Sequence, residues 1–70
     1  MMPLALASAG AQSFVKSIGG KPETRQFLEK LGFVPGSLVT VISKTDGNVI
    51  VSVKDARVAI SREMAAKIIV

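Results

Sequence analysis

The sequence contains no cysteine, histidine, tyrosine or tryptophan among its 70 residues. Without cysteine the chain can form neither a disulfide nor a thiolate metal site, which is typical of a protein in a reducing compartment. Without histidine it lacks the commonest transition-metal ligand, and none of its seven serines can be activated by the usual general base. We therefore expect no catalytic residue, no metal site and no tightly bound cofactor, and the chain is not expected to be an enzyme.

Long apolar runs are absent too. A membrane-spanning helix needs about 20 mostly apolar residues, and the longest charge-free stretch, residues 1–15, is interrupted by Pro3 and Gly10. The apolar segment at residues 4–9 lacks the length and the basic flank of a signal peptide. The sequence therefore predicts a cytoplasmic protein without membrane insertion.

The composition that is present fits one small domain over residues 1–70. Apolar residues make up 49% of the chain, which excludes intrinsic disorder. Nine basic and five acidic residues give a net charge of +4, which suits an acidic protein surface, anionic lipid or nucleic acid. The three phenylalanines, Phe14, Phe27 and Phe33, are expected in the core, so no aromatic platform for stacking single-stranded bases is predicted. We therefore do not expect nucleic-acid binding.

A short helix over residues 22–31 is the clearest local prediction. Pro22 suits the first helical position, and the acidic first turn and basic last turn match the helix dipole. Gly32 is expected to adopt the left-handed conformation that ends a helix, with Phe33 folding back onto Leu28. A second helical turn is predicted at residues 62–66, after the N-cap Ser61.

The other segments are rich in β-branched residues and predict about five antiparallel strands in a small barrel. These strands are expected at 13–18 with a bulge near 16–17, and at 38–45, 49–54, 57–60 and 67–70. Three turns connect them: Pro35-Gly36, Asp46-Gly47, which is a strong hairpin signal, and Asp55-Ala56. Gly32, Pro35, Gly36 and Gly47 are therefore the residues with an expected structural role.

The order and spacing of these features resemble the FeoA family of ferrous iron transport proteins. Residues 28–41 read LEKLGFVPGSLVTV, a leucine-rich helix end followed by a P-G turn and an alternating strand. The resemblance covers nearly the whole chain, from Met2-Pro3-Leu4 to the closing segment 57–65 and Ile68. One departure is Lys54-Asp55-Ala56, where the family often has a glycine, so the geometry of this turn is open.

The resemblance implies an SH3-like barrel and a cytoplasmic accessory role in Fe(II) uptake. The implied partner is the cytosolic, GTP-hydrolysing domain of a FeoB-type membrane iron transporter, and Fe(II) would be linked to this chain only through that transporter. Assembly, activation of GTP hydrolysis and gating are all roles proposed for the family. Self-association stays open.

Two alternatives accompany this interpretation. The same module resembles the C-terminal domain of iron-dependent repressors of the diphtheria-toxin-repressor type, although 70 residues leave no room for their helix-turn-helix. A free-standing module of such a regulator is therefore second choice, together with a small nucleic-acid-binding barrel.

Arginines are the candidate partner-binding residues. Val58 and Ile60 are expected to point inward, so Arg57 should point outward. Arg62 is the first residue of the helical turn, where a cation is unfavourable to the helix dipole, so little structural role is expected for it. Arg25, on the helix, is the third candidate.

Overall fold

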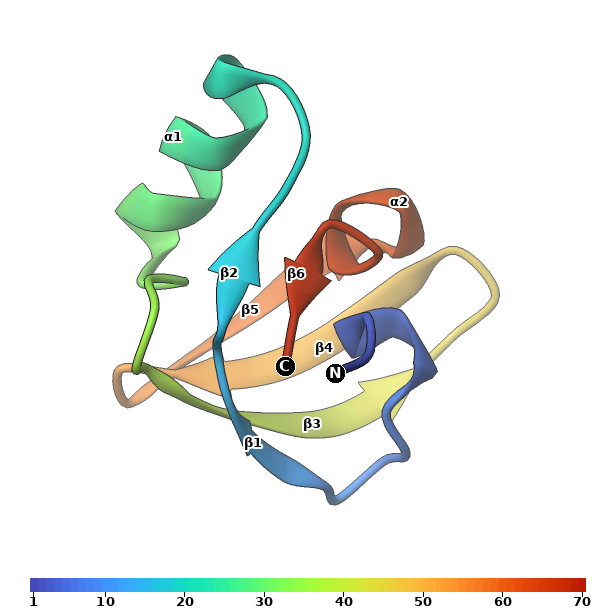
Figure 1. Ribbon diagram of the computed structural model, residues 1–70. Helices are drawn as coiled ribbons and strands as arrows, with labels where there is room; N and C mark the ends of the chain where they lie inside the picture. The colour runs from blue at the N-terminus through green and yellow to red at the C-terminus, as the bar shows by residue number, and fades with distance from the viewer.

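Two antiparallel β-sheets form the body of the protein in the computed structural model, which describes residues 1–70 (Figure 1). The first sheet has the strand order β1-β3-β4-β5, and in the second β2 pairs with β6. The elements in chain order are η1 (Leu4–Leu6), β1 (Gln12–Phe14), β2 (Ser17–Ile18), α1 (Pro22–Leu31), β3 (Leu38–Lys44), β4 (Asn48–Val53), β5 (Ala56–Ser61), α2 (Arg62–Ala65) and β6 (Ile68–Ile69). The mainly β, antiparallel fold is confirmed, with six strands instead of about five.

The extra strand arises because the segment expected as one strand over 13–18 is divided between the two sheets. The buried Val15 marks the crossing: its N–H donates to the Ser37 carbonyl at 2.9 Å, on the β3 side. The next N–H, that of Lys16, donates to the Ile69 carbonyl at 2.7 Å, beside β6. The bulge expected near residues 16–17 is therefore wrong. An irregularity of that kind lies in β3 instead, where the register shifts between Val41 and Ser43.

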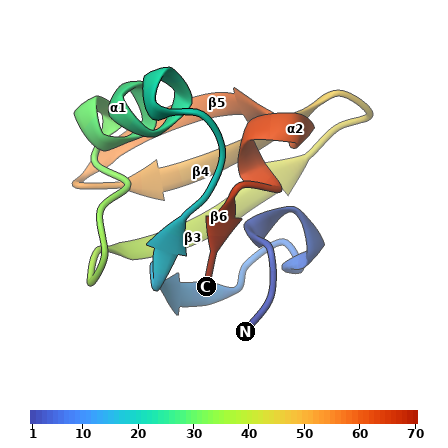
Figure 2. The same ribbon diagram turned by 45° about the horizontal axis from the view of Figure 1, so that its top comes forward.

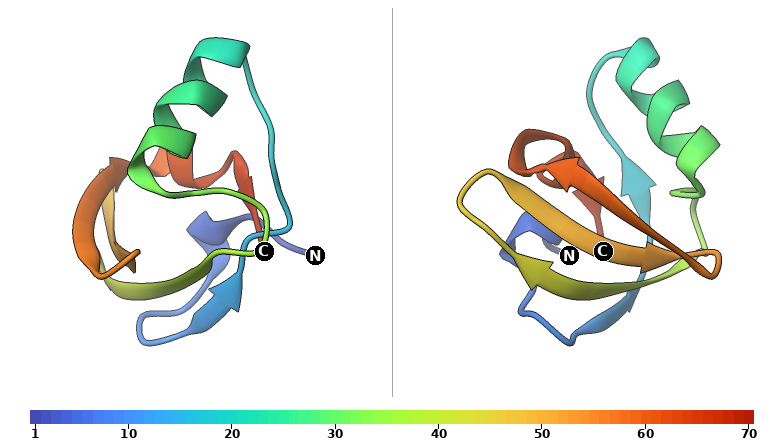
Figure 3. Two further views of the ribbon diagram at one scale, coloured as in Figure 1. Left: turned by 90° about the vertical axis from the view of Figure 1, so that its left-hand side faces the viewer. Right: turned by 180° about the vertical axis from the view of Figure 1, so that it is seen from behind.

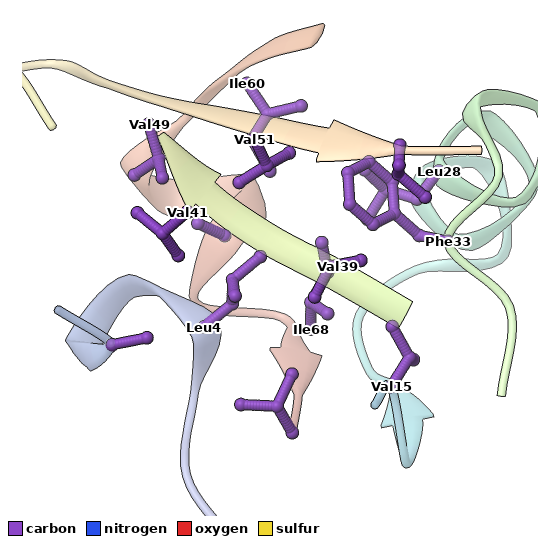
Figure 4. Packing of buried hydrophobic residues seen from close by; sticks show 14 residues of the cluster. Leu4, Val15, Leu28, Phe33, Val39, Val41, Val49, Val51, Ile60 and Ile68 are labelled. Atoms are coloured by element: carbon purple, nitrogen blue, oxygen red, sulfur yellow. The ribbon is translucent and has the colours of Figure 1, made fainter. Parts of the chain in front are cut away.

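The core lies between the sheets and is entirely apolar (Figure 4). β4 shows the strict alternation of a strand with one buried face, because Val49, Val51 and Val53 point inward. The two ends of the chain close the opposite side, where Met2 and Val70 exchange backbone hydrogen bonds of 3.0 and 2.8 Å. The 14 buried apolar residues are Leu4, Ala7, Val15, Leu28, Phe33, Val39, Val41, Val49, Val51, Val53, Ile60, Ala65, Ile68 and Val70.

Only one of the three phenylalanines belongs to this core. Phe33 is fully buried, whereas Phe14 is 63% and Phe27 47% exposed. In both exceptions the next residue along the chain, Val15 or Leu28, is the buried one. Neighbouring positions point in different directions on a strand and on a helix, so burial of one residue leaves the other outside. The expectation of three core phenylalanines is therefore wrong.

The end of α1 has the predicted geometry. Gly32 is left-handed with φ 111°, and the Phe33 N–H donates to the Leu28 carbonyl at 3.0 Å. A β-carbon at Gly32 would lie 2.9 Å from Cγ of Lys54 and 3.3 Å from Cγ2 of Val53. Glycine is thus required there both for its backbone and for the close approach of β4.

Three further turns follow along the chain, the first between α1 and β3 and the other two between strands. Gly36 has φ 91°, and the Ser37 N–H donates to the Val34 carbonyl at 2.9 Å, which is the geometry of a Pro-Gly type II turn. The β4–β5 turn consists of Lys54 and Asp55, with φ 51° and 63°, and Ala56 already belongs to β5. The Asp46-Gly47 segment connects β3 and β4 as expected, but Gly47 lies outside the left-handed region.

Candidate partner-binding surface

The three candidate arginines lie on different parts of the molecule. Arg57 is near the start of β5 and Arg62 follows its last residue, so roughly 16 Å of strand separates them. Arg25 is exposed on α1. The structure therefore does not gather the arginines into one cluster, although all three side chains are exposed.

Arg62 has a structural contact that the sequence did not indicate. Its Nη1 donates to the Asp46 carbonyl at 3.3 Å, and its backbone N–H donates to the Gly47 carbonyl at 3.2 Å. Arg62 therefore fastens the β3–β4 loop to the end of β5. The expectation that this cation has little structural reason is wrong, because the acceptors are backbone carbonyls brought there by the hairpin.

Arg57 has no such contact. It takes part in no side-chain hydrogen bond. Its direction is as expected, since Ile60 is buried, Val58 is half-buried and Arg57 is exposed. Arg57 pairs with Ser52 of β4, which places it on the outer face of the four-stranded sheet. Of the two arginines near β5, Arg57 is the one left free to contact another molecule.

Apolar side chains occupy the same outer face, nearer its other edge. Phe14 of β1 lies directly opposite Leu38 of β3, and these side chains are 63% and 46% exposed. Ile42, at the register shift of β3, is also exposed. Sequence reasoning missed this pair, but the alternation of Leu38 with the buried Val39 and Val41 could have placed Leu38 outside.

A hollow of about 560 Å³ lies between the apolar pair and the β4–β5 turn. The Pro-Gly turn forms one side of it, and Ser52, the cross-strand partner of Arg57, lies in its lining. The lining residues are Val34, Pro35, Gly36, Ser37, Leu38, Thr40, Ser52, Lys54 and Asp55. Two of the residues predicted to be structural, Pro35 and Gly36, therefore also shape this surface.

The arrangement suits binding of another macromolecule. No group of three or more carboxylates is brought together, so the five acidic residues are dispersed. Neither helix has the length and the apolar character required to cross a membrane. Exposed aromatic and aliphatic side chains beside an arginine, next to a shallow hollow, are features of protein–protein interfaces.

The chain is similar to known proteins over its whole length. The family model for the FeoA domain matches residues 2–70. A protein of Methanocaldococcus jannaschii named "Putative Fe(2+) transport protein A" is 40% identical over 70 residues, which is all of this chain and 85% of that protein.

Solved structures show the same fold. A crystal structure of an iron uptake regulatory protein (FeoA) superposes with a TM-score of 0.89 at 29% identity, covering 96% of this chain and 91% of that one. The zinc complex of FeoA from Stenotrophomonas maltophilia, described as an SH3 domain protein, has a TM-score of 0.86 at 23% identity and covers 99% and 88%. A manganese-dependent transcriptional repressor has a TM-score of 0.87 at 20% identity, but only 38% of its length is covered, so this match shows the fold alone. The SH3-like barrel and the match over residues 2–70 show that the chain belongs to the FeoA family of ferrous iron transport proteins.

Proposed function

We propose that this protein is a cytoplasmic accessory component of ferrous iron uptake that binds the GTPase-bearing cytosolic part of a FeoB-type iron transporter. Fe(II) is then linked to it through the transporter, and the protein itself acts by contact and not by catalysis. Family membership supports the link to Fe(II) transport.

The observation that carries the proposal is the outer face of the four-stranded sheet. The exposed pair Phe14 and Leu38 lies at one edge of this face, and the hollow lined by Thr40 and Ser52 lies in the middle. Arg57, whose side chain makes no hydrogen bond, lies toward the other edge. Large exposed apolar side chains on so small a domain mark an interaction site, since burial against a partner removes them from water. A cation at the rim contributes mainly to the rate of association.

The direct test is titration of the isotopically labelled protein with the soluble GTPase-bearing domain of the transporter from the same organism, in GDP and GTP-analogue forms. We expect saturable shifts on the outer sheet face and along β5, including the amides of Leu38 and Arg57. Retention of the protein on nucleic acid, with affinity falling steeply as salt rises, would instead support the regulator or nucleic-acid alternative. Absence of any shift with the transporter domain would contradict the proposed function.

A further inference from the structure

β5 ends the four-stranded sheet, and its outer edge has no strand beside it (Figure 3). The turn of two residues between β4 and β5 makes Val53 and Ala56 a hydrogen-bonded pair, and such pairs then alternate along an antiparallel ladder. The bonded positions of β5 are therefore its even-numbered residues Ala56, Val58 and Ile60. The hydrogen bond from the Arg62 N–H to the Gly47 carbonyl continues this alternation. The backbone groups of Arg57 and Ala59 therefore point away from β4.

These backbone groups have no partner. Outside the β4–β5 ladder, no backbone or side-chain hydrogen bond involves Arg57 or Ala59. Both residues are exposed. Within the strand itself, β5 contains no proline, no bulge and only one charged residue, and α1 on its inner side makes no backbone hydrogen bond to it. The edge is thus a template of about 20 Å on which an extended chain can add as a strand.

The inner side of this edge carries the apolar Val58 between two polar ends. α1 lies alongside β5 (Figure 2), with Gly32 against the start of the β4–β5 turn at one end. At the other end, Thr24 shares a cavity of about 180 Å³ with Ser61, Glu63, Met64 and Lys67. Val58 between these ends is only half-buried. A strand added here would find Val58 on its inner side and Arg57 on its outer side.

The charge around the edge is positive. The segment from residue 54 to residue 67 contains four basic residues (Lys54, Arg57, Arg62 and Lys67) and two acidic ones (Asp55 and Glu63). A second copy of this chain would bring its own β5 cations to the same edge. A segment with carboxylates is favoured over a second copy, because it supplies the opposite charge.

We propose that the free edge of β5 pairs with an extended segment of the transporter's cytosolic domain, acidic on one face and apolar on the other, which adds a fifth strand beyond β5. This inference rests on the proposed function and specifies how the partner is held. Main-chain hydrogen bonds from Arg57 and Ala59 provide the affinity, and the alternation of the added side chains provides the specificity.

The test uses a proline that removes one edge N–H. Ala59→Pro deletes a donor that points away from β4, and proline is tolerated at such positions of edge strands. Ala59→Val is the first control, since it changes the side chain but keeps the N–H. Gln12→Pro is the second control, because it places proline at the opposite edge of the sheet. The Ala11 carbonyl and the Val15 N–H bond toward the β3 side, so the alternating pattern leaves the backbone groups of Gln12 pointing away from β3.

We expect Ala59→Pro to weaken binding of the transporter domain at least tenfold, whereas both controls bind like the parent. In the parent complex, the amides of Arg57 and Ala59 should exchange with solvent at least tenfold more slowly than in the free protein. The exchange measurement needs no variant, so it tests the added strand even if Ala59→Pro fails to fold.

Three results would overturn the inference. Binding of the transporter domain without protection of these amides would leave the proposed function standing and refute the added strand. Concentration-dependent dimerisation that Ala59→Pro abolishes would assign the edge to a second copy. Failure of the parent to bind the transporter domain refutes the proposed function itself, and this inference with it.

Discussion

Phe14 lies directly opposite Leu38 across the β1–β3 ladder, and both side chains face away from the core. Cross-strand pairs of this kind contribute roughly 0.2–1 kcal/mol. Phe14→Ala should therefore lower the free energy of unfolding by no more than about 1 kcal/mol. The matched change Phe33→Ala removes a fully buried ring and should cost about 3–5 kcal/mol. Chemical denaturation of the two variants measures the difference, and equal losses would place Phe14 in the core.

Gly32→Val tests the end of α1. The left-handed backbone costs a residue with a β-carbon about 1–2 kcal/mol, and the new side chain must also displace Lys54, whose Cγ lies 2.9 Å from the β-carbon position. We expect the free energy of unfolding to fall by at least that amount. Gly47→Val is the control, because Gly47 lies outside the left-handed region and its β-carbon would meet no atom within 4 Å. An unchanged melting temperature for Gly32→Val would contradict this account of the helix end.

Asp55→Gly should stabilise the protein. Asp55 occupies a turn position with φ 63°, in the left-handed region that favours glycine. Aspartate tolerates the left-handed region better than most residues, so the strain relieved is about 1 kcal/mol, against roughly 0.4–1 kcal/mol that glycine costs through the unfolded chain. The net gain should be at most about 0.5 kcal/mol, visible as a slightly higher melting temperature. Asp46→Gly is the control, since Asp46 has no positive φ and should gain nothing.

Arg57 and Arg62 should separate into a binding and a structural role. The double change Arg57→Glu with Arg62→Glu should weaken binding of the transporter domain at least tenfold, ~1.4 kcal/mol. Most of this loss should come from Arg57→Glu alone and should diminish as salt rises. Arg62→Ala should instead lower stability by about 0.5–1 kcal/mol, because the bond to the Asp46 carbonyl is lost. Parent-like binding by the double variant at low and moderate salt would exclude this face, and Arg25 on α1 would then be the next residue to test.

Metal binding can be tested on the protein alone. Apart from three methionine thioethers, the chain offers carboxylate, hydroxyl and carbonyl oxygens, whereas selective sites for Fe(II) and Zn(II) usually use imidazole or thiolate. We expect no stoichiometric binding of Fe(II) or Zn(II) in the micromolar range. A one-to-one calorimetric isotherm with either metal would refute this expectation.

Local signals predicted much of the fold. The helix over residues 22–31, its Gly32 end and the Ser61 cap, whose Oγ accepts from the Met64 N–H at 3.1 Å, depend on neighbours in the chain. The division of residues 13–18 between two sheets depends instead on distant partners, Ser37 and Ile69, which no local pattern reveals.

The candidate surface was less predictable for the same reason. Alternation correctly placed Arg57 outside, but the contact of Arg62 with the β3–β4 loop requires the hairpin to be folded. Phe14 was misplaced because hydrophobicity alone does not say which face of a strand is buried. The pairing of Phe14 with Leu38 decides that, and it joins residues 24 positions apart.

We propose that this FeoA-type barrel works by direct contact with a FeoB-type transporter. Calorimetric titration of the protein into the GTPase-bearing domain, at low and moderate salt, tests this most directly. We expect saturable one-to-one binding that weakens as salt rises and that Arg57→Glu reduces at least tenfold. No heat of binding in either the GDP or the GTP-analogue form, with both proteins folded, would contradict it.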